Sequence, residues 1–234
     1  MKRRIAILPA RGGSRRIPNK NIRDFCGKPM IAYALDAAQK SGLFECIHVS
    51  TDSRNISEKV AELGFKIDFM RPPDLADDHT PIVPVLKYVV EQYRERECFF
   101  DEVVLIMPCS PLIDSDDLIG ASALMEKFES RKQVLAVSSY PVPVEWAFHR
   151  SDNGILTPMQ PGKFSIRSQD LGDKYFDVGM FCFFPENKIL MAEGAGDDEA
   201  FVGYEVSKSK AVDIDNEDDW QFAEAIYRGM HSDY

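Results

Sequence analysis

Residues 5–42 read IAILPARGGSRRIPNKNIRDFCGKPMIAYALDAAQKSG, and this stretch indicates how the fold begins. Residues 5–9 form a short apolar run typical of a buried strand, and a loop rich in Gly and Arg follows at once. Residues 29–41 then carry apolar side chains at helical spacing, and Gly42 is a natural helix end. The order strand, loop, helix is the first unit of an α/β fold.

The same alternation continues along most of the chain. Right-handed crossovers between such units build a mostly parallel sheet with helices on both faces. The patterns predict strands at 5–9, 46–50, 65–69, 103–107, 134–137, 178–184, 202–206 and 212–214. They predict helices at 29–41, from Ser53 to Gly64, at 82–94, 116–128 and 220–230.

Residues 138–174 interrupt this alternation. Four prolines lie there among aromatic and aliphatic residues such as Trp146 and Phe148. Apolar residues in an irregular segment need a covering surface, either on the same subunit or on a second copy, and we favour the second copy. We therefore expect one domain over residues 1–234, with a dimerisation arm at about 138–175 and a homodimer as the assembly.

Composition limits the possible partners. A chain of 234 residues can bury a full core, and its net charge of −10 argues against nucleic acid as a partner. No apolar run reaches the roughly 18 residues of a membrane span, and the run at 5–10 is too short for a signal peptide. The five cysteines and four histidines show no disulfide or metal-ligand spacing, so a cytoplasmic location is expected.

Positive charge is concentrated near the start of this acidic chain, in the loop PARGGSRRIPNKN at 9–21. Glycines let backbone N–H groups approach an anion, and Arg and Lys add charge-assisted hydrogen bonds at the carboxyl end of a strand. The loop matches neither a Walker A sequence nor a GxGxxG fingerprint. It predicts a triphosphate site, with a solvated basic turn as the alternative.

Two carboxylates near the end of the chain form a second candidate site. Asp213 and Asp215 alternate around Ile214, which places both carboxylates on one face if the segment is extended, with the isoleucine in the core. Such a pair can hold one magnesium ion. The alternative is that the acidic residues 213–219 merely begin the last helix.

Several motifs together resemble the CMP-sialic acid synthetase (acylneuraminate cytidylyltransferase) family. They follow the family's order over nearly the whole chain and comprise PARGGSRRIPNKN at 9–21, GKPMIAYALDAA at 27–38, VSTDS at 49–53, MRPPDLADD at 70–78, PCSPL at 108–112 and DID at 213–215. The resemblance implies a Rossmann-like three-layer sandwich of the nucleotide-diphospho-sugar transferase type. It also implies transfer of CMP from CTP to a nine-carbon sugar acid, with Mg²⁺ as cofactor.

Within that family, RSQDL at 167–171 and YFDVG at 175–179 most resemble the branch that activates pseudaminic acid. Val178 stands where that branch has alanine, residues 180–183 replace a more polar aromatic run, and Met107 stands where sialic acid enzymes have glutamine. The acceptors N-acetylneuraminate, legionaminate and other sugar acids therefore stay open. So does a catalytically silent sugar-nucleotide-binding protein.

The resemblance also implies roles for individual residues. The residues implied for CTP are Ala10, Arg11, Gly12, Gly13, Ser14, Lys20, Asn21, Arg71 and Asp78, and those for the sugar are Arg167, Gln169, Tyr175 and Asp177. Asp213 and Asp215 would hold Mg²⁺, and with Arg11 and Lys20 they form the catalytic set. From the residues alone, Arg71 could instead form a surface salt bridge, and Arg167 an ion pair with Asp170. A metal-bound hydroxide and the substrate's own carboxylate both stay open as general base.

Overall fold

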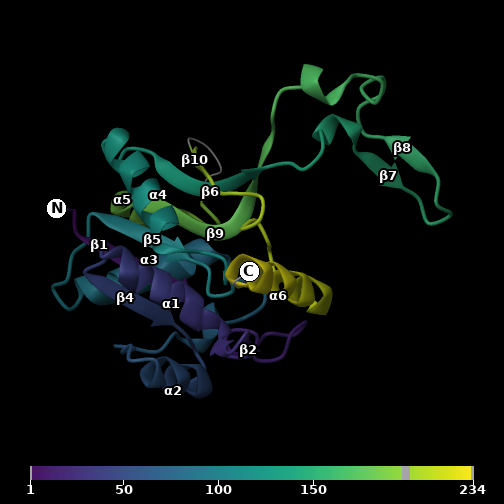
Figure 1. Ribbon diagram of the computed structural model, residues 1–234. Helices are drawn as coiled ribbons and strands as arrows, with labels where there is room; N and C mark the ends of the chain where they lie inside the picture. The colour runs from purple at the N-terminus through teal and green to yellow at the C-terminus, as the bar shows by residue number, and fades with distance from the viewer. Residues whose placement is uncertain (1, 197–200, 233–234) are drawn as a thin grey trace.

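Six strands form the central sheet of the computed structural model, which describes residues 2–196 and 201–232 (Figure 1). The strand order is β10-β6-β9-β5-β1-β4. The strands are β1 (Arg4–Pro9), β4 (Cys46–Ser50), β5 (Glu102–Ile106), β6 (Gln133–Ser139), β9 (Tyr175–Pro185) and β10 (Phe201–Glu205). Every neighbouring pair is parallel except the two that include β9, which runs antiparallel to β5 and β6. The expected mostly parallel sheet is confirmed.

Helices cover both faces of this sheet because its central strands alternate apolar side chains between them. Ala6 and Leu8 pack on one side with α1 (Met30–Ser41), α2 (Arg54–Glu62) and α4 (Ser115–Lys127). Ile5 and Ile7 pack on the other with α3 (Ile82–Arg94) and α5 (Glu186–Met191). Strands buried on both faces are typical of parallel sheets. The result is the three-layer sandwich that the sequence predicts.

A third, smaller core lies beside the sheet and joins distant parts of the chain. It contains Ile17 from the basic loop, Phe25 from β2 (Asp24–Phe25), Ile214, and Trp220 from α6 (Glu217–His231). The adjoining strand β3 (Lys28–Pro29) pairs with β2. Ile214 has no exposed surface, so its expected place in a core is confirmed. This core fixes the basic loop against the acidic segment that precedes α6.

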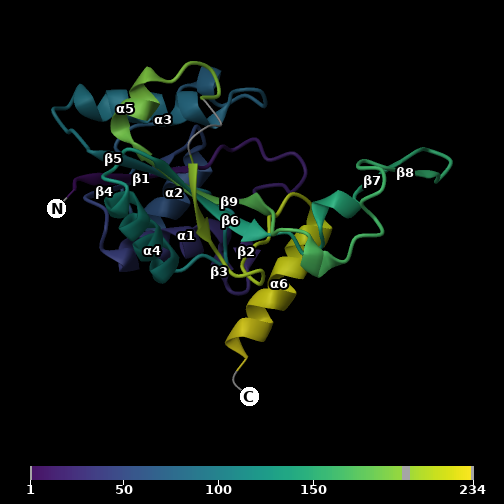
Figure 2. The same ribbon diagram turned by 90° about the horizontal axis from the view of Figure 1, so that it is seen from above.

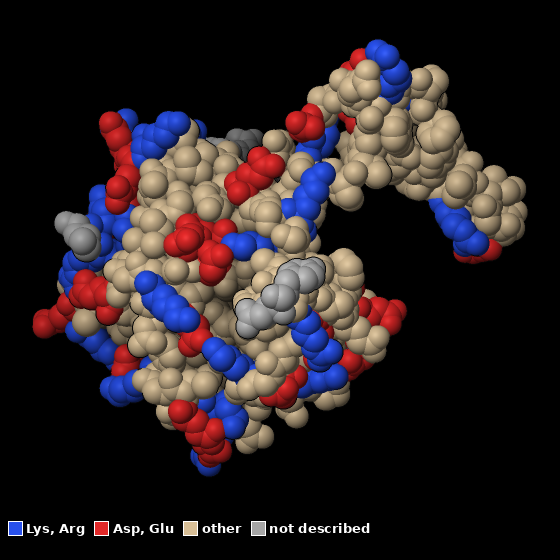
Figure 3. Space-filling view, viewed as in Figure 1, with Lys and Arg blue, Asp and Glu red and all other residues tan. Residues whose placement is uncertain are grey.

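The segment between β6 and β9 forms an arm that extends away from the sheet, as two perpendicular views show (Figures 1 and 2). It carries the small hairpin of β7 (Phe148–Arg150) and β8 (Leu156–Pro158), and the 3₁₀ turns Val144–Trp146 and Ser168–Asp170. Its surface is mostly uncharged (Figure 3). Its exposed large apolar residues are Tyr140, Val142, Phe148, Ile155, Leu156, Met159 and Phe164. Trp146 is half-buried, near the ring of Phe164.

Two of the expected strands are not formed. Residues 65–69 are irregular, although Phe65 and Ile67 pack towards α1 and α2 and Phe69 packs on the opposite side. Residues 212–214 are irregular as well, because Val212 and Ile214 both pack into the third core and pair with no strand. In both segments the alternating apolar side chains pack into a core, but the backbone forms no strand hydrogen bonds with a neighbouring strand.

The remaining expected elements are present, with ends shifted by a few residues at most. Helix α3 and strand β4 have the predicted bounds. Helix α5 was not predicted, because a six-residue helix with one buried side chain, Ile189, is too short to show helical spacing. Strand β9 begins at Tyr175, three residues earlier than expected. Within the described residues, no helix is long and apolar enough to cross a membrane.

His48 lies on the edge strand β4, in a buried polar cluster on the side of the sheet that α3 covers. Its Nδ1 is 3.1 Å from the Tyr93 hydroxyl, which donates to Asp68 at 2.8 Å, and its ring stacks on Phe69. Its Nε2 is buried, and none of the described residues forms a hydrogen bond with it. Burial lowers the pKa of His48 from 6.5 to about 4, which keeps the ring neutral in the folded protein.

This histidine makes stability depend on pH. As pH falls below 6.5 the unfolded chain takes up a proton on His48 before the folded chain does, so stability is lost between pH 6.5 and 4. The loss approaches about 3 kcal/mol. Urea unfolding of His48→Phe should lose this pH dependence over that window, with His149→Phe on the exposed arm as control. If the free energy of unfolding changed with pH equally in the parent and in His48→Phe, His48 would not be the source of this pH dependence.

Candidate active site

A polar cavity of about 310 Å³ opens at the carboxyl ends of β1 and β5. Parallel α/β sheets place their ligands at this edge. The basic loop forms one wall, and the acidic segment before α6 forms another. The lining residues are Pro9, Arg11, Ser14, Arg15, Arg16, Ile17, Lys20, Asn21, Met107, Pro108, Cys109, Gly179, Asp213 and Asp215. The cavity thus brings together six residues that the sequence predicts for the site: Arg11, Ser14, Lys20, Asn21, Asp213 and Asp215.

The far end of the basic loop is held by hydrogen bonds as well as by the burial of Ile17. The Lys20 ammonium donates to the Ile214 carbonyl at 2.6 Å, which joins the loop to the acidic segment. Asn21 is buried and donates from Nδ2 to the Arg11 carbonyl at 3.1 Å. The Cys109 thiol donates in turn to Asn21 Oδ1 at 3.1 Å. Contacts within the protein therefore fix the shape of the loop.

The arginines of the loop are paired with carboxylates. Arg11 donates to Asp78 Oδ1 at 2.6 Å and to the Asp77 carbonyl at 2.7 Å, and Arg15 also pairs with Asp78. Arg16 pairs with Asp215 at 2.8 Å. These side chains are partly or largely exposed, so each pair contributes little stability and exchanges easily for another anion.

The glycines of the loop serve different purposes. A Cβ on Gly12 would lie 2.9 Å from the Ser53 Cβ, so this residue must be glycine for the loop to pass the start of α2. The Gly12 N–H donates to Asp52 at 2.9 Å and does not face the cavity as a free donor. Gly13 has open space around it, and Ala10 is fully buried. Gly12, Gly13 and Ala10 do not line the cavity, although the sequence assigns them to CTP.

Arg71 lies just outside the cavity and is buried. Its guanidinium donates to Ser50, to the hydroxyl at 3.1 Å and to the carbonyl at 2.6 Å, so the surface salt bridge considered above is not what the structure shows. Burial is the main cause that lowers the pKa of Arg71 to about 10; the Asp52 carboxylate opposes this lowering and the Arg11 charge adds to it. Arg71 therefore remains a cation at neutral pH, fixed at the end of β4.

Asp213 and Asp215 lie in an irregular segment, and the expectation that they end a strand is wrong. They nevertheless share one cavity, because Ile214 between them is anchored in the third core. Partial burial raises the pKa of Asp213, and the nearby Asp215 carboxylate raises it further. The last helix has its own N-cap at Asn216, which accepts from the Asp218 and Asp219 N–H groups, so these two aspartates are not needed to start it.

The donor set fits a magnesium ion that takes most of its ligands from elsewhere. Two hard carboxylate oxygens face a polar cavity beside a basic loop, and Mg²⁺ commonly binds one or two carboxylates together with waters and substrate phosphates. No group of three or more His, Cys, Asp or Glu side chains suited to a metal occurs in residues 2–196 and 201–232. A Cβ on Gly179 would lie 3.8–3.9 Å from the Asp213 carboxyl group, an ordinary contact distance, so it is the positive φ of 62° that favours glycine here.

The four residues assigned to the sugar are divided between the arm and β9. Arg167 and Gln169 lie on the arm, and the Arg167 guanidinium pairs with Asp170 at 2.9 Å, as the alternative interpretation expected. Tyr175 and Asp177 lie at the start of β9, and the Asp177 carboxylate accepts from the Gly179 N–H at 2.8 Å. Within one chain, Arg167 and Gln169 do not reach the polar cavity.

Val178 and Met107, which both depart from the expected family pattern, lie in different surroundings. Val178 is buried in the core with α1 and α4 and does not line the cavity. Met107 lines the cavity directly. Cys109, Arg15 and Arg16 also line the cavity, and all three lie within the motifs quoted from the sequence, although no site role was expected for them. Burial raises the pKa of Cys109 to about 12, so it acts as a neutral hydrogen-bond donor at neutral pH.

Comparison with known sequences gives the family. Residues 5–134, which carry the basic loop and β1 to the start of β6, match the family described as "Cytidylyltransferase". The chain belongs to the cytidylyltransferase family. It is similar to the pseudaminic acid cytidylyltransferase of Campylobacter jejuni, with 32% identity over 97% of both chains. It is also similar to the CMP-N,N′-diacetyllegionaminic acid synthase of Legionella pneumophila, with 29% identity over 95% of both chains.

A solved structure supports the cytidylyltransferase fold. The chain superimposes on a CMP:2-keto-3-deoxy-manno-octonic acid synthetase, described as complexed with CTP, with a TM-score of 0.71. The alignment covers 97% of this chain and 99% of that one, at 16% identity. At this identity the likeness concerns the fold, and it agrees with the three-layer sandwich described above.

Replacing Lys20 with Met keeps the length and removes the charge from the cavity wall. We expect the dissociation constant for CTP to rise about tenfold or more, because phosphate charge loses a partly buried partner. Calorimetric titration with CTP measures this. Lys40→Met, on exposed α1 surface outside this cavity, serves as the control. Unchanged CTP affinity in a folded Lys20→Met protein would exclude Lys20 from phosphate binding.

Proposed function

We propose that the protein transfers CMP from CTP to pseudaminic acid, giving the CMP-sugar and pyrophosphate. The observation that carries this proposal is the 32% identity, over nearly the whole chain, to a pseudaminic acid cytidylyltransferase. The cavity adds chemical support, because it combines Arg11 and Lys20 with the carboxylates Asp213 and Asp215. We further propose that the reaction takes place in the cytoplasm, where CTP is available, and supplies an activated sugar for cell-surface or flagellar glycans.

The proposed nucleotide site uses the pairs that already hold the loop. The triphosphate would replace the Asp78 carboxylate on Arg11 and approach Lys20, with Ser14 and Asn21 lining the same cavity. Arg71, fixed by Ser50 at the end of β4, would contact the cytosine. Asp78 would then support its own loop without the Arg11 pair. Replacing the Arg11–Asp78 ion pair costs little free energy, because a partly exposed ion pair contributes little stability.

In the proposed reaction, the anomeric hydroxyl oxygen of the sugar acid attacks the α-phosphorus of CTP in line. The new P–O bond forms while the bond to the bridging oxygen breaks, pyrophosphate carries away the electron pair, and the hydroxyl proton passes to a base such as the sugar acid's own carboxylate. Mg²⁺ held by Asp213 and Asp215 would supply Lewis-acid neutralisation of the phosphate charge. Arg11 and Lys20 would orient the triphosphate and stabilise charge on the leaving group, so that positioning and electrostatics lower the barrier.

Other nine-carbon acids form the second candidate. N-acetylneuraminate and legionaminate stay open because Val178 departs from the pseudaminic acid pattern and the legionaminic acid enzyme is 29% identical. A protein that binds the nucleotide without turnover is the candidate from a different class. Its fold would be the same, because function resides in the site.

The deciding experiment is pyrophosphate release with each nucleoside triphosphate and a panel of sugar acids. We expect turnover with CTP and pseudaminic acid, and little with ATP, GTP or UTP. Faster turnover with another nine-carbon acid would reassign the acceptor. Binding of CTP without pyrophosphate release, across the whole panel and with Mg²⁺ present, would favour the silent binding protein.

Magnesium dependence tests the two carboxylates. Asp213→Asn and Asp215→Asn keep side-chain size and remove one charge each, so the magnesium concentration for half-maximal activity should rise about tenfold or more. Activity titrated against magnesium measures this, with circular dichroism to check folding. Asp218→Asn, an exposed residue in the first turn of α6, is the control. Titrations of both variants that match the parent would place the metal elsewhere.

We also propose that the arm joins two subunits. It extends from the sheet with exposed apolar side chains, among them Ile155 and Phe164, each more than 60% exposed. Burying such residues is favourable at about 25 cal/mol per Å² of apolar surface, and a second copy offers an equivalent arm. Because the arm points away from its own cavity, Arg167 and Gln169 would contact the sugar bound to the neighbouring subunit.

Light scattering at micromolar concentration should therefore give twice the mass of one chain. Phe164→Asp places a charge in the proposed interface and should shift the protein towards monomer. Ile119→Asp, on the exposed side of α4, should not. A parent protein that is monomeric throughout the micromolar range would refute the dimer.

A further inference from the structure

Lys210 joins the segment that carries Asp213 to the start of α4. Its ammonium donates to the Asp117 carboxylate at 2.7 Å and also to the Asp114 carboxylate. The same two carboxylates cap α4, since Asp114 accepts from the Asp117 N–H at 3.0 Å and Asp117 accepts from the Asp114 N–H at 3.2 Å. The Lys210 bridge therefore fixes the chain three residues before Asp213 to a helix end that lies 96 residues away in the sequence.

The Lys210 bridge is better protected from water than the ion pairs of the basic loop. The side chains of Lys210 and Asp117 are 15% and 8% exposed. Burial lowers the pKa of Lys210, but the hydrogen bonds to Asp114 and Asp117 outweigh burial, so the pKa lies above its ordinary value and the ammonium stays charged at neutral pH. Removing one partner of such a bridge leaves a buried charge unpaired, so the bridge does not exchange easily.

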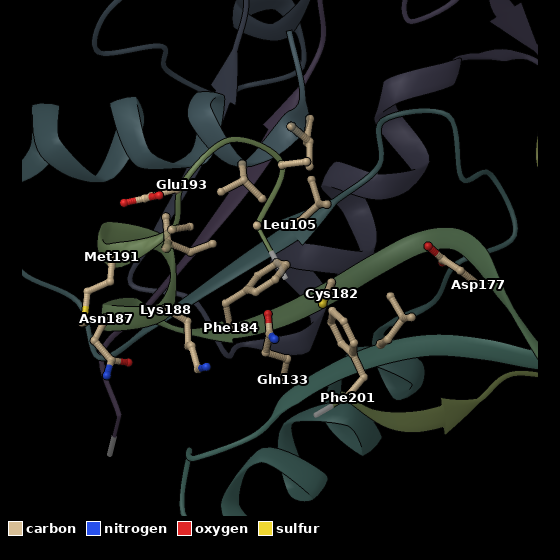
Figure 4. Close-up of a pocket in the computed structure, with 17 residues that line it drawn as sticks. Leu105, Gln133, Asp177, Cys182, Phe184, Asn187, Lys188, Met191, Glu193 and Phe201 are labelled. Atoms are coloured by element: carbon tan, nitrogen blue, oxygen red, sulfur yellow. The ribbon is translucent and has the colours of Figure 1, made fainter. Parts of the chain in front are cut away.

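Lys210 is not among the described residues that line the polar cavity. Nor is it among those that line a larger cavity, of about 770 Å³, which extends past α5 to Asp177 of β9 (Figure 4). It lines instead a cavity of about 330 Å³ beside α1 and α6. Lys210 can therefore influence the polar cavity through the residues that it holds, or through its charge, but not by contact with a molecule bound there.

The Lys210 bridge connects two walls of the polar cavity. On one side, the Val212 N–H donates to the Lys210 carbonyl at 2.9 Å, and this tight turn leads directly into Asp213. On the other side, Asp114 ends the loop between β5 and α4, in which Cys109 lines the cavity. Displacing either end of the bridge would move Asp213 relative to Cys109.

We propose that Lys210 is a positioning residue that sets the metal affinity of the polar cavity by holding Asp213 in place. The inference rests on the proposed function in one respect, because it takes Asp213 and Asp215 as the ligands of Mg²⁺. Residues that orient metal ligands matter for affinity, and losing one commonly weakens metal binding about tenfold to a hundredfold.

The direction of the change separates positioning from simple charge. Lys210 is a cation near two carboxylates, so removing its charge alone would favour a metal ion there. Loss of positioning has the opposite effect, because a carboxylate that is free to move binds the metal less well. Weaker metal binding after loss of Lys210 therefore indicates positioning.

Lys210→Met removes the bridge, and metal binding without nucleotide measures the effect. Electron paramagnetic resonance reports free Mn²⁺, which shares the preference of Mg²⁺ for oxygen ligands, and needs no turnover. We expect the dissociation constant for Mn²⁺ to rise about tenfold. Lys210→Arg retains the charge and the donors, with room in the adjoining cavity, and should stay within about threefold of the parent.

Lys208→Met is the matched control, because it removes the same charge from an exposed position in the same segment. Its dissociation constant for Mn²⁺ should stay within about twofold of the parent or fall. Urea unfolding of each variant shows separately whether the protein is folded and how much stability it has lost.

A milder variant covers the case in which Lys210→Met does not fold. Asp114→Asn keeps a good N-cap residue for α4 and removes one of the two carboxylates that Lys210 binds. Asp116→Asn, in the exposed first turn of the same helix, removes a carboxylate that is not part of the bridge. We expect the dissociation constant for Mn²⁺ to be about threefold higher in Asp114→Asn than in Asp116→Asn.

The outcomes distinguish this inference from the proposed metal site. If Asp213→Asn weakens Mn²⁺ binding but a folded Lys210→Met protein binds Mn²⁺ as well as the parent or better, the inference is wrong and the metal site stands. A loss of stability without a change in Mn²⁺ affinity would likewise make Lys210 a structural residue only. Where Lys210→Met is unfolded, equal affinities of Asp114→Asn and Asp116→Asn would overturn the inference. Mn²⁺ binding that is unchanged in both Asp213→Asn and Asp215→Asn would overturn the metal site and the inference together.

Discussion

The candidate active site depends on one contact between segments 194 residues apart in the chain, the hydrogen bond from the Lys20 ammonium to the Ile214 carbonyl. Beside it, Ile17 and Ile214 are buried in the same small core, next to Phe25 and Trp220. Neither segment has regular secondary structure at this point, so the sheet alone would not hold them in place. Their shared burial brings the basic loop and the two aspartates to one cavity.

The fold could be predicted from the sequence to a large extent because parallel strands buried on both faces leave a clear apolar signal. The apolar pattern predicts strands less reliably where side chains pack into a core but the backbone pairs with no neighbouring strand. Phe65, Ile67 and Phe69 alternate as a strand does, yet they lie beyond the edge strand β4 and form no ladder. Helix α5 gave no periodic signal because it is too short.

The place of the site was predictable from the sequence, and its contacts were less so. The basic loop led us to expect an anion site, the resemblance led us to expect a metal at Asp213 and Asp215, and the structure brings both groups to one cavity. The sequence could not show that Arg11 and Arg16 are already paired with Asp78 and Asp215, because these pairs join segments far apart in the chain. It also could not show that Cys109 supports the loop through Asn21, since that relation depends on the packing of β5 against the loop.

The arm leaves the sheet at the end of β6 and returns at the start of β9, and these two strands are antiparallel neighbours. Ser139 lies opposite Tyr175, and the Tyr140 N–H donates to the Lys174 carbonyl at 2.9 Å, so the pairing continues to the base of the arm. In topological terms the arm is an elongated hairpin loop. Its length and sequence can therefore change during evolution without altering the strand order or register of the sheet that carries the polar cavity.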